Sequence, residues 1–415
     1  MTFTKQLTRF YQLGKDNNSK YSKDNILKLS SLFGNPHKHV NTIHVSGTNG
    51  KGSTCYKLAQ VLIDNNIKTG MSISPGISSY RERIQFNNQL IPEDFVADFL
   101  PVFFSGLDKG LYTASFLEGM SIMAFKYFQE MGADLSIIEV GIGGRTDFTN
   151  ILEKKALSII TSIGIDHEYV LGDTIEEVLV NKLGIAKPGT PLLIGPDVPQ
   201  TIPRRLTRDI GSDLYITKEF KTGIGIFNAA ENTVRSAVDI LNEKYQMDLK
   251  IRDEVIDRNI AGRMEKVNLE NLKHIYKRLP KSIILNVGHN YHAINHSLSN
   301  SPQFNKENLI LLLEIRSEKT VDDVFPLMRK FSNEIYIAQG STNLSKSIKE
   351  LKQKAIEDKV VVNVVGSGKI EEVLSFLFDE REDIEEKDIV IFCSFSMMKL
   401  LRQKFGYNDE FDQFN

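Results

Sequence analysis

The chain has 415 residues, a length that favours two or three domains over a single core. With 41 % apolar residues, 25 % charged residues and a formal net charge of -2, its composition is globular and indicates neither a nucleic-acid binder nor a membrane-surface protein. Its two cysteines, Cys55 and Cys393, lie far apart, and no apolar run approaches the ~20 residues that span a bilayer, so we expect reduced, buried thiols and a cytoplasmic location.

The first informative segment is residues 42–54, TIHVSGTNGKGST. A short β-rich run ends at Gly47, and apolar residues recur at helical spacing from Cys55 onward, which predicts a strand, a glycine-rich turn and a helix. Such a turn points backbone N–H groups and a helix dipole at a polyphosphate. The residues that we expect to bind the nucleotide are Gly47, Thr48, Asn49, Gly50, Lys51, Gly52 and Ser53.

This turn departs from the common phosphate-loop pattern G-x-x-x-x-G-K-[ST]. Val45 stands in the place of the first glycine, and Gly52 follows Lys51 where a Ser or Thr would normally hold a magnesium ion. An oxygen ligand must therefore come from elsewhere, and ligands collect at the carboxyl ends of parallel strands. Three residues near predicted strand ends meet this requirement: Ser74, Glu139 and His167.

Each of these three residues also has a less specific explanation. Ser74 precedes a proline and could simply be a turn residue, while His167 could serve merely to orient its loop. Glu139 lies within an apolar run, where a buried carboxylate requires a cation or strong hydrogen bonds. The residue types alone therefore favour Glu139 most strongly as a metal ligand.

Strand-like and helix-like segments alternate along the rest of the chain. A helix predicted over residues 113–132 is followed by continuously apolar strands at 135–141 and 156–165, typical of a parallel sheet covered on both faces. Further strands are predicted within KSIILNVGHN, NLILLLEI, NEIYIAQG and DIVIFCS. We predict an α/β fold with a large N-terminal P-loop domain, residues 1–255, built on a mostly parallel sheet, and a smaller C-terminal Rossmann-like domain, residues 256–415.

Several segments, in order along nearly the whole chain, resemble the folylpolyglutamate synthase and dihydrofolate synthase family of the Mur ligase superfamily. The stretch LFGNPHKHVNTIHVSGTNGKGST is similar to its first signature, and IIEVGIGGRTDFTNIL to its second. The stretch ITSIGIDHEYVLGDTIEEVLVNKLGIAKPG resembles its third signature, and AGRMEKV, NVGHNYHA and CSFSMMKLL resemble markers of its C-terminal domain. The combination is far more specific than the glycine-rich turn alone.

The resemblance implies an ATP-dependent amide ligase. In that family a pterin carboxylate is phosphorylated by ATP, and the amino group of L-glutamate then attacks the acyl phosphate. Lys51 would hold the β- and γ-phosphates, Ser74 and Glu139 a first Mg²⁺, and His167 would help to hold a second. The implied partners are small molecules, namely ATP, L-glutamate and dihydropteroate or a reduced folate, with no nucleic acid and no membrane, and we expect a monomer.

The same resemblance implies roles for residues in the later part of the chain. Lys182 matches a lysine that is often carbamylated, with an ordinary surface lysine as the alternative. Asn232 matches an adenine-placing asparagine, Arg263 an arginine that contacts the phosphates, and His289 a catalytic histidine. Acceptor or glutamate contacts are expected, by position in matching segments only, from Arg83, Ser121 and Ser394.

The second half of the chain also departs from the family pattern. Asn286 in NVGHN replaces an acidic residue that contributes to nucleotide binding, and it can form hydrogen bonds but carries no charge. This departure leaves open a divergent relative that binds nucleotide without ligating. A P-loop kinase or ATPase is a separate alternative, which would not explain the second α/β domain. The choice between dihydropteroate and reduced folate as acceptor is open as well.

Overall fold

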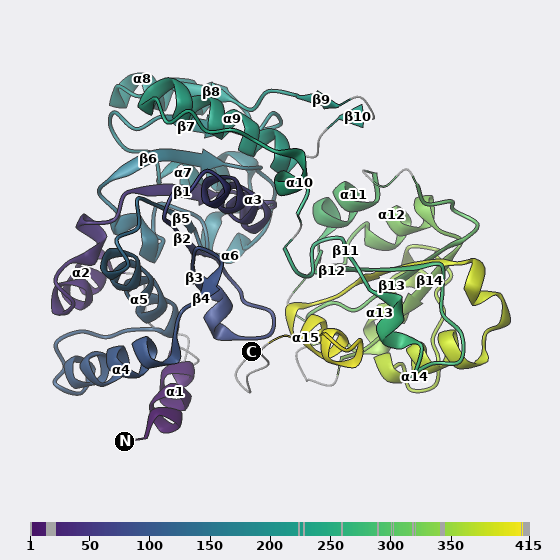
Figure 1. Cartoon of the computed structure of the whole chain (residues 1–415). Coiled ribbons are helices and arrows are strands. Elements are labelled where there is room, and N and C mark those ends of the chain that lie inside the picture. The colour runs from purple at the N-terminus through teal and green to yellow at the C-terminus, as the bar shows by residue number, and fades with distance from the viewer. Residues whose placement is uncertain are drawn as a thin grey trace. The chain divides into compact units, whose positions relative to one another are not determined.

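The computed structural model describes residues 2–13, 22–222, 225–226, 229–258, 260–288, 290–299, 301, 303–317, 319, 321–340, 345–407 and 409 (Figure 1). Contacts divide these residues into two compact units. Unit 1 holds the described residues up to 76 and those from 80 to 258, and unit 2 holds residues 77–79 and the described residues that follow 258. Each unit is built on its own β-sheet, so the predicted α/β fold is confirmed.

The sheet of unit 1 has the strand order β4-β3-β2-β5-β1-β6-β7-β8. The six strands from β2 to β8 in this order are parallel, and β3 and β4 extend the sheet as antiparallel strands. The inner strands are buried on both faces, which explains their unbroken apolar sequences. The bounds are β1 Thr42–Ser46, β2 Thr69–Ser72, β3 Ile84–Phe86, β4 Gln89–Leu90, β5 Leu135–Glu139, β6 Lys155–Ile160, β7 Leu192–Ile194 and β8 Leu214–Ile216.

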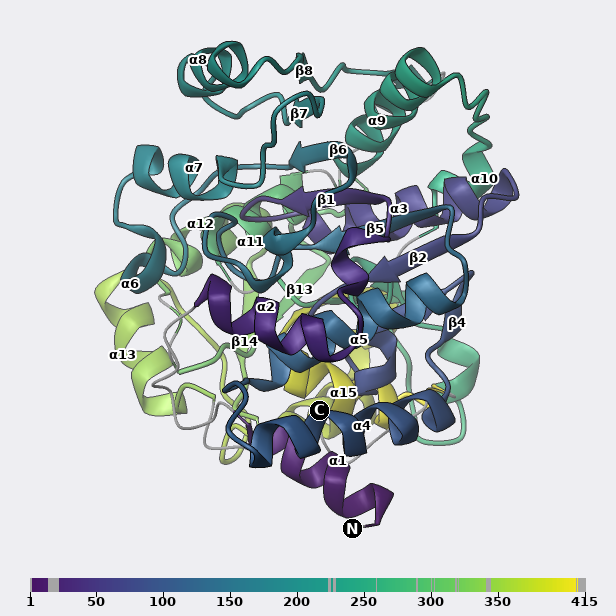
Figure 2. The same ribbon diagram turned by 90° about the vertical axis from the view of Figure 1, so that its left-hand side faces the viewer.

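Helices cover this sheet, and Figure 2 shows two of them, α2 and α5, in front of its strands. The predicted helix at residues 113–132 is confirmed as α5, which begins with a capping box between Ser115 and Glu118. The bounds are α1 Phe3–Gln12, α2 Lys23–Leu32, α3 Lys51–Asp64, α4 Glu93–Asp108, α5 Phe116–Glu130, α6 Glu168–Leu171, α7 Ile175–Leu183, α8 Thr201–Ile210, α9 Ala229–Tyr245 and α10 Asp253–Ile256. Shorter elements of this unit are η1 Pro36–Lys38, η2 Tyr80–Arg83, η3 Phe148–Ile151 and the hairpin of β9 Lys221–Thr222 and β10 Gly225–Ile226.

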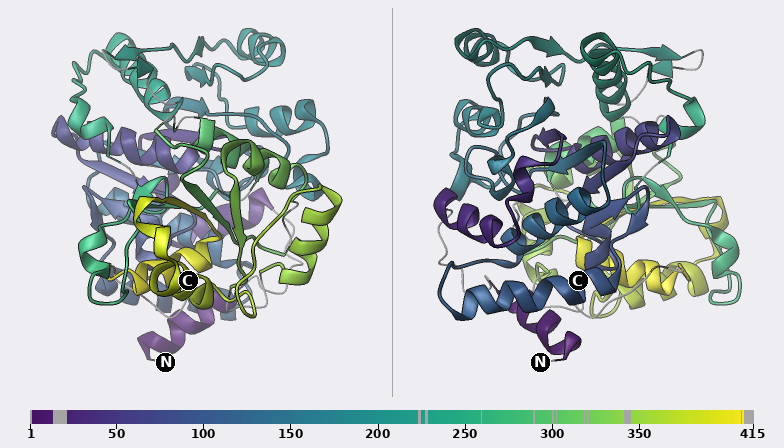
Figure 3. Two further views of the ribbon diagram at one scale, coloured as in Figure 1. Left: turned by 90° about the vertical axis from the view of Figure 1, so that its right-hand side faces the viewer. Right: turned by 60° about the vertical axis from the view of Figure 1, so that its left-hand side comes forward.

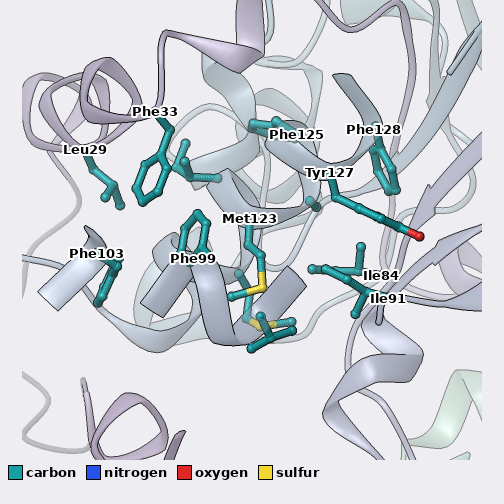
Figure 4. Close-up of a cluster of buried hydrophobic side chains, with 14 of the residues drawn as sticks. Leu29, Phe33, Ile84, Ile91, Phe99, Phe103, Met123, Phe125, Tyr127 and Phe128 are labelled. Atoms are coloured by element: carbon teal, nitrogen blue, oxygen red, sulfur yellow. The ribbon is translucent and has the colours of Figure 1, made fainter. Parts of the chain in front are cut away.

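A cluster rich in aromatic side chains forms a large core of unit 1 (Figure 4). Phe33 and Phe99 stack with their ring centroids 4.1 Å apart, and Phe103 meets Phe10 edge-on at 5.2 Å. Helices α1, α2, α4 and α5 all contribute to this cluster. Their apolar faces therefore pack together into one helical layer next to the sheet.

The sheet of unit 2 has the order β11-β12-β15-β13-β14, with β11 antiparallel and the other four strands parallel. The four parallel strands are those predicted from the sequence, whereas β11 was not predicted. Apolar clusters cover both faces of the sheet, whose strands run between helices in Figure 3. The bounds are β11 Glu265–Lys266, β12 Ser282–Asn286, β13 Leu309–Leu313, β14 Glu334–Ile337 and β15 Asp388–Phe392, with helices α11 Tyr291–Ser299, α12 Val324–Phe331, α13 Ile348–Glu357, α14 Ile370–Ser375 and α15 Phe395–Lys404. Three further short helical segments of unit 2 are η4 Leu269–Leu272, η5 Phe376–Glu380 and η6 Glu382–Glu386.

Both cysteines are buried and free, as expected. Among the helices that the structure describes, none combines the length and the apolar character needed to cross a bilayer.

Candidate active site

The glycine-rich turn joins β1 to α3, which begins at Lys51. Gly50 has a φ of 83° and Gly47 a φ of 145°, and an added Cβ at Gly47 would lie only 2.0 Å from Thr161 Oγ1. Position 47 therefore requires glycine for its backbone conformation and for space. The Lys51 ammonium donates to the carbonyls of Gly47 at 3.0 Å and Thr48 at 3.2 Å, so it lies across the mouth of the turn.

The segment after β6 anchors this turn, a contribution that the sequence did not reveal. Thr48 donates its backbone N–H to the carbonyl of Ser162, while the Thr48 hydroxyl donates to the carbonyl of Gly164 at 2.9 Å. Asn49 donates its N–H to Ser162 Oγ at 3.0 Å and accepts from the Thr161 hydroxyl at 2.7 Å. The signal available in the sequence was position alone, since residues 161–164 follow a strand adjacent to β1.

Glu139 ends β5 at the same edge of the sheet, where its side chain is buried. Its Oε2 accepts the backbone N–H of Ser74 at 2.9 Å, and a Cβ added at Gly52 would lie 3.6 Å from the same oxygen. The structure thus brings Gly52, Ser74 and Glu139 together, although they are far apart in the sequence. A buried carboxylate beside a serine offers the oxygen donors that suit Mg²⁺.

His167 and Lys182 follow β6 along the chain. His167 lies at the start of α6 with a φ of 54°, half-buried, and its ring is 6.2 Å from that of Tyr169. Lys182, on α7, is only 4 % exposed and donates to the Gly47 carbonyl at 2.9 Å, the same carbonyl that Lys51 contacts. Burial, and then the positive charge of Lys51, lowers the pKa of Lys182 to about 7.

A loop at residues 140–147 follows Glu139 and is held by an aspartate that the sequence reading did not select. Asp147 is buried, and its carboxylate accepts the backbone N–H of Ile142 at 3.0 Å and of Thr149 at 2.9 Å. Burial raises the pKa of Asp147, and these hydrogen bonds oppose that effect. Across the described residues, no three His, Cys, Asp or Glu side chains gather as a metal centre built from such side chains alone would require.

Asn232 lies in unit 1, buried near the start of α9. Its Oδ1 accepts the backbone N–H of Phe220 at 3.0 Å, so the amide orients the chain before the β9–β10 hairpin. The neighbouring Glu231 forms a buried ion pair with Lys57 of α3 at 3.1 Å, which ties α9 to the helix that carries Lys51.

The two residues of unit 1 assigned to the acceptor lie on separate elements. Arg83 belongs to η2, and its guanidinium lies 5.5 Å from the centre of the Phe116 ring. Ser121 lies on α5 and donates its hydroxyl to the carbonyl of Leu117 at 2.9 Å.

The remaining expected residues belong to unit 2. The Arg263 guanidinium lies 5.4 Å from the centre of the Phe395 ring, and Ser394 caps α15 by accepting the N–H of Met397 at 3.3 Å. Asn286, 3 % exposed, donates to Ser297 Oγ at 2.7 Å and to the Met264 sulfur at 3.2 Å, while its Oδ1 accepts from the N–H of Gly288 at 3.1 Å. His289 lies outside the described residues.

A buried glutamate in unit 2 was also not selected from the sequence. Glu314, directly after β13, accepts the backbone N–H of Ser394 at 2.7 Å and the hydroxyl of Ser345. It is fully buried, and a Cβ added at Gly340 would lie 3.6 Å from its Oε1.

Comparison with known sequences finds dihydrofolate and folylpolyglutamate synthases. No protein-family model matches the chain. The chain is 29 % identical over 351 residues to the dihydrofolate synthase/folylpolyglutamate synthase of Buchnera aphidicola, an alignment that covers 79 % of each protein. It is 37 % identical over 185 residues to the mitochondrial folylpolyglutamate synthase of Bos taurus, covering 43 % of this chain and 32 % of that one. The folylpolyglutamate synthase of Lacticaseibacillus casei is 34 % identical over 179 residues, 42 % of each.

Solved structures share the fold over almost the whole chain. E. coli FolC in complex with DHPP and ADP matches with a TM-score of 0.79 at 20 % identity, covering 97 % of both chains. A bifunctional folylpolyglutamate synthase/dihydrofolate synthase with Mn, AMPPNP and L-glutamate bound matches with a TM-score of 0.78 at 22 % identity, covering 97 % of this chain and 98 % of that one. The apo form of the L. casei enzyme matches with a TM-score of 0.77 at 21 % identity, covering 97 % of this chain and 99 % of that one.

Proposed function

Because the chain belongs to the dihydrofolate synthase and folylpolyglutamate synthase family, we propose that it is an ATP-dependent ligase that joins L-glutamate to a folate-type carboxylate. The acceptor is dihydropteroate, a reduced folate, or both. The observation that carries the proposal is the convergence of Lys51, Lys182 and Glu139 on one glycine-rich turn.

The reaction proceeds through an acyl phosphate. An oxygen of the acceptor carboxylate attacks the γ-phosphorus of ATP and the bond to the β-phosphate oxygen breaks, which releases ADP. The glutamate amine then attacks the acyl carbon, loses a proton and expels inorganic phosphate. Both steps depend on positioning and on neutralised charge, which Lys51 and the N–H groups at the start of α3 supply to the phosphates.

A buried carboxylate and a half-buried serine beside the turn offer oxygen donors that fit the magnesium that such a transfer uses. Ser74 and Glu139 would hold a first ion, and His167 would help to hold a second. When bound, the ions neutralise charge on the transferred phosphoryl group.

Carbamylation of Lys182 is part of this proposal. With a pKa of about 7, a large share of the Lys182 amine is neutral at neutral pH, and the neutral amine is the form whose lone pair attacks carbon dioxide. The nitrogen loses a proton in this reaction, and a buried cation becomes an anion beside the expected metal site. Isotopically labelled bicarbonate followed by carbon NMR would detect the carbamate, and its absence from the wild-type protein would contradict this part of the proposal.

The remaining assignments concern substrate contacts. Asn232 places the adenine, Asn286 contributes to nucleotide binding, and Arg263 contacts the phosphates. His289 acts as a catalytic residue. Arg83, Ser121 and Ser394 serve the acceptor or glutamate. We also propose that the protein is a cytoplasmic monomer. A dimer found by sedimentation analysis would contradict the monomeric state.

The deciding experiment incubates the protein with ATP, L-glutamate and either dihydropteroate or tetrahydrofolate, and weighs the products by mass spectrometry. We expect a product that carries at least one added glutamate, and the acceptor that yields it identifies the activity. ATP consumption that is unchanged without glutamate would indicate a kinase or ATPase instead. Tight ATP binding with no product would support the divergent relative, which the Asn286 replacement motivates.

A further inference from the structure

Four buried polar side chains form a continuous hydrogen-bonded chain within unit 1, behind the glycine-rich turn. Lys155 Nζ lies 2.8 Å from His44 Nδ1, and His44 Nε2 lies 2.7 Å from Thr149 Oγ1. The Thr149 hydroxyl in turn contacts Asp147 Oδ1 at 2.5 Å. All four residues are at most 8 % exposed, and none of them was selected from the sequence as part of the site.

The hydrogen-bonding capacities of these groups fix the direction of the chain. An ionised Asp147 can only accept, and it does so from two backbone N–H groups and from the single hydroxyl proton of Thr149. Thr149 Oγ1 must therefore accept from His44, so the imidazole carries its proton on Nε2. His44 Nδ1 is then the acceptor for the Lys155 amine, whose pKa burial lowers well below its ordinary value. The hydrogen-bonded chain therefore runs from the Lys155 amine to the Asp147 carboxylate through His44 and Thr149.

Each end of this chain holds a segment that contributes to the ligase site. Lys155 also donates to the carbonyl of Ile185 at 2.9 Å and to Asn150 Oδ1 at 3.3 Å. The Asn150 amide donates to the carbonyl of Gly184 at 3.0 Å. The contacts to Gly184 and Ile185 therefore hold the backbone directly after α7, the helix that carries Lys182. At the other end, Asp147 holds the backbone of Ile142, three residues after Glu139.

We propose that Lys155 is a positioning residue for both Lys182 and Glu139. It holds the segment after the Lys182 helix directly and acts through His44, Thr149 and Asp147 on the segment after Glu139. His44 lies on β1, the strand that ends in this turn, so the chain joins three segments of the site through one central side chain. The inference rests on the proposed ligase function. A purely structural role would require only that the space be filled, whereas this role requires the Thr149 hydroxyl and the Lys155 amine as donors.

The test compares variants that keep volume but remove one donor. Thr149→Val replaces the hydroxyl with a methyl group and Thr149→Ser retains it, while Lys155→Met removes the amine. The matched control is Lys154→Met, the adjacent lysine, whose side chain is exposed. We expect Thr149→Val and Lys155→Met to lower kcat about tenfold to a hundredfold, as misplacements near 1 Å do, with a much smaller change in the Kd for ADP. Thr149→Ser should recover most of the loss, and Lys154→Met should match the wild type.

A second readout does not depend on ligation. Nitrogen NMR of the wild-type protein should show His44 as the neutral tautomer with its proton on Nε2, and an Nδ1-protonated ring or an imidazolium would overturn the chain. If Thr149→Val folds and its kcat equals that of Lys154→Met, the positioning role is wrong even if the tautomer is correct. Should Lys155→Met not fold, Thr149→Val and the tautomer still decide the matter. An absence of turnover in the wild type would count against the proposed function. The NMR result would test the hydrogen-bonded chain independently of that function.

Discussion

Two buried glutamates, Glu139 in unit 1 and Glu314 in unit 2, occupy equivalent places in their sheets. Each lies at the carboxyl end of a parallel strand and accepts the backbone N–H of a serine, Ser74 at 2.9 Å or Ser394 at 2.7 Å. Each also faces a glycine at which a Cβ would lie 3.6 Å from a carboxylate oxygen. Burial raises the pKa of Cys55 and Cys393 well above the ordinary value, and the charge of the respective glutamate adds to the effect.

The two glutamates differ in the groups that lie next to their carboxylates. In unit 2 the Ser345 hydroxyl closes on Glu314 Oε1. In unit 1 the glycine facing Glu139 is Gly52, which directly follows Lys51 of the anion-binding turn. A buried carboxylate at a strand end is therefore not sufficient evidence for a metal site, and the neighbouring groups decide its role.

The largest effect should separate these two glutamates. Glu139→Gln removes the charge proposed to hold magnesium and should lower turnover by about a thousandfold or more, since each ~1.4 kcal/mol is a factor of ten. Glu314→Gln should lower turnover by about tenfold or less and instead cost ~1–3 kcal/mol of unfolding free energy, because one of its hydrogen bonds is lost inside the core. Steady-state kinetics and urea unfolding of both variants would measure this. Equal losses of turnover would contradict the distinction.

The hydroxyl that replaces the missing one at Gly52 should be that of Ser74. Ser74→Ala removes a proposed magnesium oxygen and should lower turnover about a hundredfold, a loss of roughly 3 kcal/mol. Ser53→Ala, the serine adjacent to Gly52, should have a clearly smaller effect. Titration of activity with magnesium would show a raised requirement for Ser74→Ala, and the reverse ranking of the two serines would refute the assignment.

Lys182 should make stability depend on pH in a predictable direction. Its pKa of about 7 in the folded protein lies below the ordinary value of 10.5, so the unfolded chain binds more protons between these values. The free energy of unfolding should therefore rise with pH across that window, with the full penalty below pH 7 and on the order of 5 kcal/mol recovered above pH 10.5. Urea unfolding in buffer free of carbon dioxide would test this, with Lys182→Met as control, whose profile should lack that rise.

The smallest effect is expected at Asn286. Its amide donates to Ser297 and Met264, and Asn286→Asp would remove both donors and bury a charge. We expect a loss of ~1–3 kcal/mol of stability and no increase in turnover beyond about threefold. A large gain in ligation would instead show that the asparagine limits activity in this chain.

The sequence predicted the parallel strands because both faces of the sheet are buried and their apolar runs are unbroken. It also placed Ser74 near Glu139, since ligands and their holders gather at carboxyl strand ends. It missed β11, a strand of two residues without a periodic signal, and it missed the anchoring of the turn by residues 161–164. The buried hydrogen-bonded chain from Lys155 to Asp147 could not be predicted from the sequence either. His44 and Lys155 are separated by 111 positions, and only the pairing of β1 with β6 brings them together.

The close approach of Gly47 to residues 161 and 162 limits how this segment can vary in evolution. Two of the three atoms nearest to an added Cβ are backbone nitrogens, at 3.0 and 3.1 Å, so shortening the Thr161 side chain cannot make room for alanine. Gly52 differs, because its nearest neighbours are carboxylate oxygens at 3.6 and 3.8 Å. In a saturation library selected for function, we expect glycine alone to survive at position 47, whereas alanine should fit sterically at position 52. Replacing Gly47 would require the backbone of residues 161 and 162 to move, which one or two substitutions do not achieve. We therefore expect relatives that share this turn to keep glycine at this position.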